Sequence, residues 1–160
     1  MLPASKILVL IVEDHPDTQS LLAEAFEQDG YEAVVAFDGD TGLSIVRERH
    51  PALVCLDLNL PRISGHEVCE RIREDPALQD VAILMMSTGR SPEKHAHALD
   101  AGADVYLPKP FEMDKLLALA RELVVSRSRD PRASAEHEVP AKSDLPDDEL
   151  TNLAPARVAG

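Results

Sequence analysis

The amino-acid sequence predicts an α/β fold, a doubly wound (βα)5 three-layer sandwich with a five-stranded parallel sheet. Short apolar runs alternate with longer segments whose apolar residues recur at helical spacing. Glycine or proline stands one or two residues after four of these longer segments, where it would end a helix. Strands that alternate with helices favour a parallel sheet covered by helices on both faces. Right-handed crossovers then give three layers.

The first elements follow from apolar patterning. The first strand is expected at residues 6–12, where Lys6 leads into a continuous apolar run typical of a central parallel strand covered on both faces. Residues 18–28 carry apolar side chains on one helical face, and Gly30 ends this helix. Residues 33–37 have the composition of a short strand, and a turn is expected at residues 38–39.

The middle of the chain repeats the same alternation. Residues 41–49 predict a second helix, which Pro51 stops. The next strand is expected at residues 52–56 and leads into a loop rich in turn-forming residues. Residues 67–74 predict a third helix, and Pro76 breaks it.

The last two repeats complete the predicted sheet. Residues 81–86 form the fourth apolar strand. A serine cap followed by proline opens the fourth helix, which spans residues 92–101 and is closed by Gly102. The fifth strand is expected at residues 105–107, and the last helix at residues 111–125.

The sequence changes character after the last predicted helix. We expect one folded domain over residues 1–125 and a disordered tail over residues 126–160, with no output domain. The tail contains recurring prolines and mixed charges but no aromatic residue. Such a segment buries too little apolar surface to offset the entropy of ordering it. A transient helical turn at residues 147–153 could dock a partner, but a solvated tail is the simpler interpretation.

Composition limits the classes of function. The chain of 160 residues carries a net charge of −13, which argues against nucleic-acid binding and against anionic membrane surfaces. The protein is therefore expected to be monomeric or weakly dimeric, with neither nucleic acid nor membrane as a partner. The first apolar run is too short to span a membrane, and acids rather than a signal-peptide cleavage pattern follow it, so the protein is expected to be cytoplasmic. Cys55 and Cys69 have no motif spacing and are interpreted as reduced packing residues.

Polar residues follow four of the predicted strands. They are the pair Glu13-Asp14, then Asp57, the pair Ser87-Thr88, and Lys109. The carboxyl ends of parallel strands lie side by side, so these residues are expected to converge on one crevice. Carboxylates that close repel one another unless a cation or proton intervenes. The pattern indicates a divalent-metal site that handles a phosphoryl group.

Each of these residue types suits that chemistry. A partly shielded carboxylate such as Asp57 can act as a nucleophile toward phosphorus, and a cation must bridge it to an anionic donor. Glu13 and Asp14 supply the oxygen ligands that Mg²⁺ prefers. Lys109 can pair with a phosphoryl oxygen, and the Ser87 hydroxyl can donate to another. Singly, each residue is more often a cap, turn or surface charge; the joint occurrence at successive strand ends is what points to a site.

Several short motifs accompany these site residues. They are residues 12–14 (VED), 56–61 (LDLNLP) with Gly65 after them, 86–89 (MSTG), 101–104 (AGAD) and 106–111 (YLPKPF). Together these motifs are very specific. By these motifs, residues 6–125 resemble the receiver domain of two-component response regulators, which has a flavodoxin-like fold, and the resemblance covers the whole predicted domain.

The resemblance implies a role for each site residue. Asp57 would be phosphorylated by a phosphohistidine on a sensor histidine kinase, or by a hybrid kinase or phosphotransfer protein. Four ligands would hold Mg²⁺: Glu13, Asp14, Asp57 and the backbone carbonyl of Asn59. Lys109 would contact the phosphoryl group, Ser87 would be the switch hydroxyl, and Tyr106 would rotate inward on activation. The Lys109–Pro110 peptide would be cis.

The switch motif departs from the family pattern. Thr88-Gly89 also fits the switch motif, but the spacing to Asp57 and Lys109 favours Ser87, with Thr88 as the alternative. Thr88 would then be bulkier than is usual beside the phosphate.

His15 is expected to be a loop residue rather than to face the pocket. His95 and His97 stand two apart on a helix and so point to different faces.

The sequence favours a single-domain response regulator that switches binding to a downstream protein target. It would not be an enzyme beyond catalysing its own phosphorylation and dephosphorylation. The alternative is an intermediate phosphate shuttle in a multi-step phosphorelay. A haloacid-dehalogenase-type phosphatase is disfavoured because Asn59 stands where that class needs an acid. A scaffold that ignores phosphorylation is disfavoured by the intact set of site residues.

Overall fold

The computed structural model describes residues 6–89 and 91–129. Its strands are β1 (Leu8–Val12), β2 (Glu32–Ala36), β3 (Leu53–Asp57), β4 (Ala82–Thr88) and β5 (Val105–Lys109). Its α-helices are α1 (Pro16–Gln28), α2 (Gly39–Arg49), α3 (Gly65–Glu74), α4 (Pro92–Ala101) and α5 (Met113–Arg129), and a short 3₁₀ helix, η1, spans Pro76–Leu78. None of the described helices is long and apolar enough to cross a membrane.

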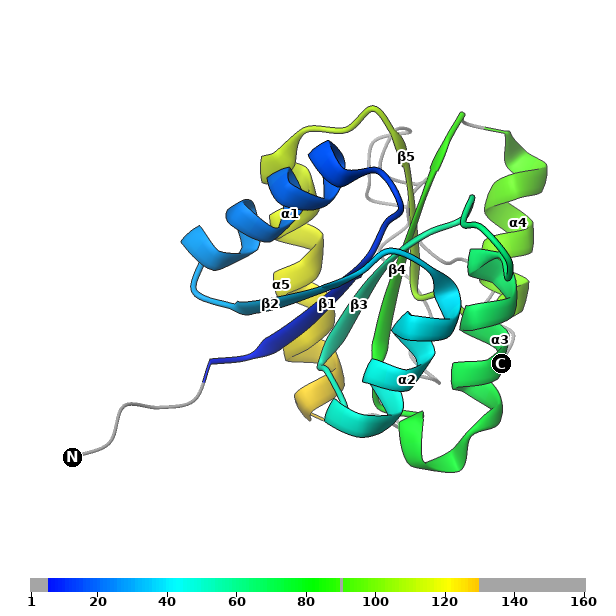
Figure 1. The fold of residues 1–160 in the computed structure, drawn as a ribbon, viewed down its shortest axis with the longest axis horizontal. Coiled ribbons are helices and arrows are strands. Elements are labelled where there is room, and N and C mark those ends of the chain that lie inside the picture. The colour runs from blue at the N-terminus through cyan, green and yellow to red at the C-terminus, as the bar shows by residue number, and fades with distance from the viewer. Residues whose placement is uncertain (1–5, 90, 130–160) are drawn as a thin grey trace.

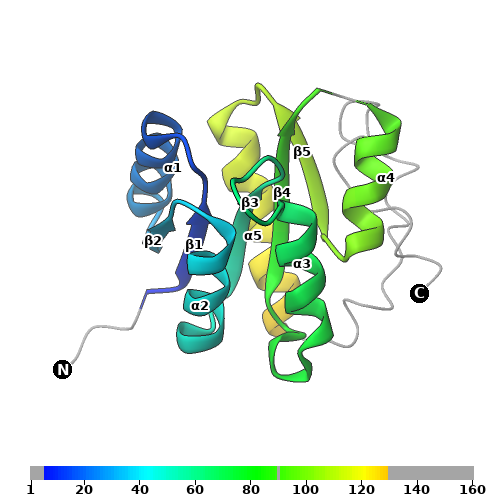
Figure 2. The same cartoon turned by 45° about the vertical axis from the view of Figure 1, so that its right-hand side comes forward.

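The strands form one parallel sheet in the order β2-β1-β3-β4-β5. Helices α1 and α5 cover one face, and α2, α3 and α4 cover the other (Figure 1). Figure 2 brings α3 and α4 forward, with α5 behind the strands. The predicted doubly wound three-layer fold is confirmed.

The alternation of side chains along the strands explains the two cores. In β1, Val9 and Ile11 pack with α1 and α5, whereas Leu10 and Val12 pack with α2, α3 and α4. All four side chains are fully buried. A strand covered on both faces is apolar at every position, which is why the sequence shows continuous runs rather than alternation.

The direction of winding changes next to β1. The chain passes from β1 through α1 to β2, and then crosses back through α2 to β3 on the other side of β1. Helices α1 and α2 therefore leave the sheet on opposite faces (Figure 1). The carboxyl ends of β1 and β3 flank the point where the winding direction reverses, which is where ligands bind in such sheets.

Several strands extend further than the apolar runs predict. The strands β3, β4 and β5 include Asp57, Thr88 and Lys109 as their last residues. The parallel ladder continues through these polar residues, with Ser87 opposite Pro108 and Thr88 opposite Lys109. Backbone pairing, which is independent of side-chain polarity, sets the strand ends. The predicted turn at residues 38–39 is the start of α2, where the Asp38 carboxylate accepts a hydrogen bond from the Thr41 N–H at 2.8 Å.

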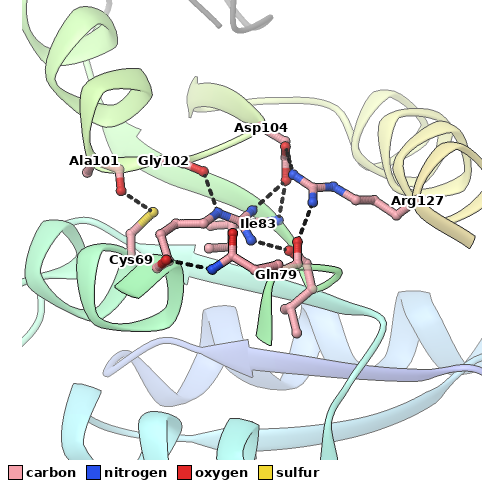
Figure 3. Close-up of polar contacts among 9 residues, drawn as sticks. Cys69, Gln79, Ile83, Ala101, Gly102, Asp104 and Arg127 are labelled. Carbon is pink, nitrogen blue, oxygen red and sulfur yellow. Dashed lines mark hydrogen bonds and ion pairs between the residues drawn. The ribbon is translucent and has the colours of Figure 1, made fainter. Parts of the chain in front are cut away.

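Helix α5 corrects the expected boundary after Val125. The helix continues to Arg129, so residues 126–129 are helix rather than tail. Arg127 is only 5% exposed; it donates to the Gln79 carbonyl at 2.6 Å and to the Asp104 carboxylate (Figure 3). The apolar periodicity of the sequence ends near Val125. Such periodicity cannot predict a helical turn that is held by polar partners distant in sequence. The rest of the predicted tail, residues 130–160, lies outside the described residues.

The carboxylate of Asp104 also accepts from Arg73 at 2.9 Å and from the Ile83 N–H at 2.9 Å. We call this group the Arg73–Asp104–Arg127 cluster. It lies just before β5, at the end of the sheet opposite the carboxyl ends of the strands, and it joins α3, β4, β5 and α5.

Candidate functional site

Three carboxylates gather at the carboxyl ends of β1 and β3. Val12 pairs with Leu56 across these strands, so the next residues, Glu13 and Asp57, are neighbours. Glu13 and Asp57 are 1% and 5% exposed, and Asp14 is exposed. One oxygen from each of the three carboxylates lies within 4.8 Å of the others. The sequence prediction that these acids converge is correct.

The loop after β3 fixes the carboxylate of Asp57. The Leu58 N–H donates to the Met86 carbonyl at 2.8 Å, which continues the pairing with β4. The Asn59 N–H then donates to Asp57 Oδ1 at 3.0 Å. Asn59 itself is exposed and lies at the start of the loop. The backbone thus holds one carboxylate oxygen and leaves the other turned toward the site.

Gly65 lets this loop close tightly. Its N–H donates to the Leu58 carbonyl at 2.9 Å. A Cβ at this position would stand 2.4 Å from the Asp57 carbonyl oxygen and 2.8 Å from Leu58 Cα. Any larger residue would therefore push the loop away from the strand end that carries Asp57.

Lys109 joins two of the acids. Its Nζ donates to Glu13 Oε1 at 2.9 Å and to Asp57 Oδ2 at 3.2 Å. Burial alone would lower the pKa of Lys109, but the hydrogen bond to Glu13 and the negative charges of Asp57 and Glu13 outweigh it and raise the pKa. Lys109 is therefore a fixed positive charge at this site.

The charged form of Glu13, unlike that of Lys109, is disfavoured at this site. Burial, together with the charge of Asp57, raises the pKa of Glu13 despite the hydrogen bonds from Lys109 and the His15 N–H. The latter bond is 3.1 Å long. One ammonium does not balance three carboxylates, and the donor set consists only of oxygen. Such a set fits a hard divalent cation.

The two candidate switch hydroxyls differ in environment. Ser87 is fully buried, whereas Thr88 is exposed. The Ser87 hydroxyl donates to the Thr88 carbonyl at 3.4 Å. Ser87 directly follows Met86, which lies opposite Asp57 in the β3–β4 ladder. The inner hydroxyl beside the acids is thus that of Ser87.

Tyr106 lies inward, between β4 and α4. Its ring is 1% exposed and its hydroxyl donates to the Gly89 carbonyl at 3.2 Å. Burial raises the pKa of Tyr106, and a hydrogen bond with Ser87 opposes this rise. The His95 ring stacks on Tyr106 with the ring centroids 5.4 Å apart. A continuous line of contacts therefore runs from the buried hydroxyl to α4.

The remaining predictions for single residues have clear outcomes. The Lys109–Pro110 peptide is cis, as the resemblance implied. His15 is exposed and contributes only its backbone N–H to the site. His97 meets His66 edge to face while His95 meets Tyr106, so the two histidines do face different ways.

Sequence reasoning missed Gln19. This residue is 6% exposed on α1, and its side-chain amide donates to the Glu13 carbonyl at 3.1 Å and to the Ala36 carbonyl at 3.3 Å. A signal was present, because Gln19 shares a helical face with the buried Leu22 and Phe26. A polar residue inside an apolar face requires a hydrogen-bond partner.

Comparison with known proteins agrees with this geometry. Residues 9–121 match the family model described as the response regulator receiver domain. The chain is 34% identical over 131 residues to the DNA-binding dual master transcriptional regulator RpaA of Synechocystis, a match that covers 82% of this chain and 54% of RpaA. It is also 34% identical over 145 residues to the response regulator MprA of Mycobacterium tuberculosis, with 91% and 61% covered. The chain thus spans somewhat more than half the length of these curated relatives.

Solved structures share the fold. A CheY-like receiver domain protein from Methanospirillum hungatei superposes with a TM-score of 0.74 at 26% identity, covering 79% of this chain and 99% of that one. The chemotaxis response regulator CheY4 of Vibrio cholerae gives a TM-score of 0.71 at 28% identity, covering 74% and 99%.

These relatives correct one expectation. The prediction that nucleic acid is excluded as a partner is wrong, because the similar regulator RpaA is a DNA-binding protein. The net charge of −13 describes this chain alone, whereas almost half of RpaA lies outside the match. The expectations about membranes and association state stay predictions.

Proposed function

The chain belongs to the response regulator receiver domain family, and from this premise we propose that it accepts a phosphoryl group on Asp57 from a phosphohistidine of a histidine kinase. The reaction depends on Mg²⁺ and switches the binding of a protein target. One observation supports this most directly. The buried Asp57 carboxylate lies 3.2 Å from Lys109 Nζ inside a cluster of three acids.

The transfer is a displacement at phosphorus. An Asp57 carboxylate oxygen attacks the phosphorus atom, an O–P bond forms, and the N–P bond to the donor imidazole breaks. The imidazole nitrogen keeps the electron pair and takes a proton from solvent. Lys109 pairs with a phosphoryl oxygen and offsets its charge, as an ammonium does at other phosphate sites.

Glu13 and Asp14, with Asp57 and the Asn59 carbonyl, are the groups we expect to hold Mg²⁺. When bound, Mg²⁺ supplies the positive charge that lets an anionic donor approach anionic Asp57. The protein holds the carboxylates of Glu13 and Asp57 in place. The two buried acids are held by Lys109, and the Asp57 carboxylate is oriented by the Asn59 N–H.

The switch is proposed to run through Ser87 and Tyr106. The Ser87 hydroxyl would turn from the Thr88 carbonyl toward a phosphoryl oxygen on Asp57, because an anionic acceptor makes the stronger hydrogen bond. Tyr106 would respond because its hydroxyl interacts with Ser87. The output surface would then include β5 and α4, where Tyr106 and His95 meet.

The chain acts on itself in this proposal, catalysing only its own phosphorylation and dephosphorylation. A cytoplasmic setting is part of the proposal. It is supported by the buried thiol of Cys55, since cysteines stay reduced in that compartment.

The proposal is tested with Mg²⁺ and a phosphoryl mimic. Beryllofluoride and Mg²⁺ should shift the amide NMR signals of Asp14, Asp57, Ser87 and Lys109, with the shifts spreading to Tyr106. Acetyl phosphate should add one phosphoryl group to the wild type and none to Asp57→Asn. Asp100→Asn, an exposed aspartate on α4, is the matched control. Labelling of Asp57→Asn at the wild-type rate, or turnover of a phosphomonoester, would overturn the proposal.

A further inference from the structure

Gln19 is a polar residue on the core-facing side of α1. It is 6% exposed and lies on the helical face that buries Leu22 and Phe26. A buried carboxamide costs stability unless its donors are used. A glutamine buried at this position therefore calls for hydrogen-bond partners.

The contact is with two strand ends. Gln19 Nε2 donates to the Glu13 carbonyl at 3.1 Å and to the Ala36 carbonyl at 3.3 Å. The Ala36 carbonyl also accepts from the Glu13 N–H at 3.0 Å. Glu13 is therefore held on both sides of its Cα. Its N–H is held by β2, and its C=O is held by α1 through Gln19.

This restraint is independent of the Glu13 side chain. The carboxylate of Glu13 bonds to Lys109 at 2.9 Å and to the His15 N–H at 3.1 Å. A cation or phosphoryl group would compete for Lys109, and the side-chain contacts would then rearrange. The backbone contacts of Gln19 involve none of the reacting atoms, so they persist through such a change.

We propose that Gln19 is a positioning residue, which preorganises Glu13 so that the acid cluster binds a divalent cation more tightly. Outer groups that orient ligating side chains commonly contribute a factor of about 10–100 to metal affinity. The proposal rests on the proposed function in taking Mg²⁺ as the cation.

The test compares two glutamines of the same helix. Gln19→Met keeps the length of the side chain but removes its donors, and Gln28→Met makes the same change at an exposed position. The dissociation constant for Mg²⁺ is measured by following amide NMR shifts at residues 13, 14 and 57. We expect about tenfold weaker binding for Gln19→Met and no change for Gln28→Met.

A structural effect is separated from positioning by Phe26→Leu. Phe26 is fully buried on the same helix face and lies in the core between α1 and the sheet. This variant should lose stability toward urea and keep the wild-type Mg²⁺ affinity. Equal weakening of Mg²⁺ binding in Phe26→Leu would show that any loosening of α1 suffices, which overturns the proposal.

A further measurement needs no variant. In the wild type without Mg²⁺, the side-chain amide protons of Gln19 should exchange with solvent far more slowly than those of Gln28. Equal exchange of the two amides, or Mg²⁺ binding by folded Gln19→Met with wild-type affinity, would overturn the role of Gln19. Absence of Mg²⁺ binding by the wild type would instead overturn the proposed function.

Discussion

Replacing Arg127 by methionine tests whether the Arg73–Asp104–Arg127 cluster holds the end of α5 to the sheet. Methionine keeps much of the apolar stem of arginine but removes the guanidinium. That group donates to the Gln79 carbonyl and the Asp104 carboxylate, and the Arg127 side chain is 6% exposed. These contacts connect the last turns of α5 to the loop before β4 and to the start of β5 (Figure 3).

The expected loss of stability is that of a hydrogen bond to a charged group rather than that of a buried charge left without a partner. A hydrogen bond to a charged group contributes about 1.5–3 kcal/mol. Removing one partner of a buried ion pair costs about 3–5 kcal/mol when the other charge is left alone. Asp104 is not left alone, because Arg73 and the Ile83 N–H still donate to it at 2.9 Å each. We therefore expect Arg127→Met to lower the free energy of unfolding by about 2–3 kcal/mol.

Asp104→Asn should be more damaging than Arg127→Met. It removes the carboxylate that the buried guanidinium of Arg127 shares with the half-buried guanidinium of Arg73. Its expected cost is that of a broken buried pair, about 3–5 kcal/mol. The matched control is Arg121→Met, on the same helix, since Arg121 forms an exposed pair with Asp29; exposed pairs contribute little.

The assay is urea unfolding followed by far-ultraviolet circular dichroism, because the chain has no tryptophan for fluorescence. The expected order of unfolding midpoints is Arg121→Met, then Arg127→Met, then Asp104→Asn, from highest to lowest. Equal midpoints for Arg121→Met and Arg127→Met would refute the anchoring role of Arg127. A smaller loss for Asp104→Asn than for Arg127→Met would refute the charge argument.

Three further predictions concern the site. Without Mg²⁺, Glu13→Gln should gain stability relative to the wild type as pH rises above 4.5, because the raised pKa of Glu13 means that folding disfavours its ionised form; urea unfolding at several pH values measures this. Gly65→Ala should lower stability by about 1–3 kcal/mol and slow labelling of Asp57 by acetyl phosphate. Ser87→Ala should stop beryllofluoride shifts from reaching Tyr106, whereas Thr88→Ala should not.

Each of these three predictions has a result that would contradict it. The raised pKa of Glu13 in the folded state predicts that the wild type loses stability relative to Glu13→Gln as pH rises. A stability advantage of the wild type over Glu13→Gln that grows with pH would contradict this. Unchanged labelling of Gly65→Ala would mean that the loop absorbs the added methyl group without moving Asp57. If the beryllofluoride shifts fail to reach Tyr106 in Thr88→Ala but still reach it in Ser87→Ala, the roles assigned to the two hydroxyls would be exchanged.

The sequence predicted the fold and the convergence of the acids because both depend on patterns along the strands. A strand buried on two faces has to be apolar throughout, and the first polar residue after it is then conspicuous. Asp57 and Lys109 are such residues, and parallel topology alone brings them to one edge. Their separation of 3.2 Å could not be predicted, because it depends on how the loop bearing Gly65 folds back.

Charge failed as a guide to partners for a related reason. Net charge describes only the residues that are counted. The residues of this chain match about half the length of a relative such as RpaA. The fold of a domain follows from its own residues, since it buries its own core. Its partners can be set by residues elsewhere in the protein.

The two residues that sequence reasoning placed wrongly or missed share a chemical feature. Gln19 and Arg127 are long polar side chains whose N–H groups reach backbone carbonyls far away in sequence, at Ala36 and Gln79. Helical periodicity sorts residues by polarity, so it treats a buried donor of this kind as surface or as the end of a helix. Yet buried carbonyls at strand ends and turns need hydrogen-bond donors, and such side chains can supply them. In α1 the polar residue within the apolar face, Gln19, contacts the ends of two neighbouring strands. One of these contacts is with Glu13, the buried acid beside Lys109.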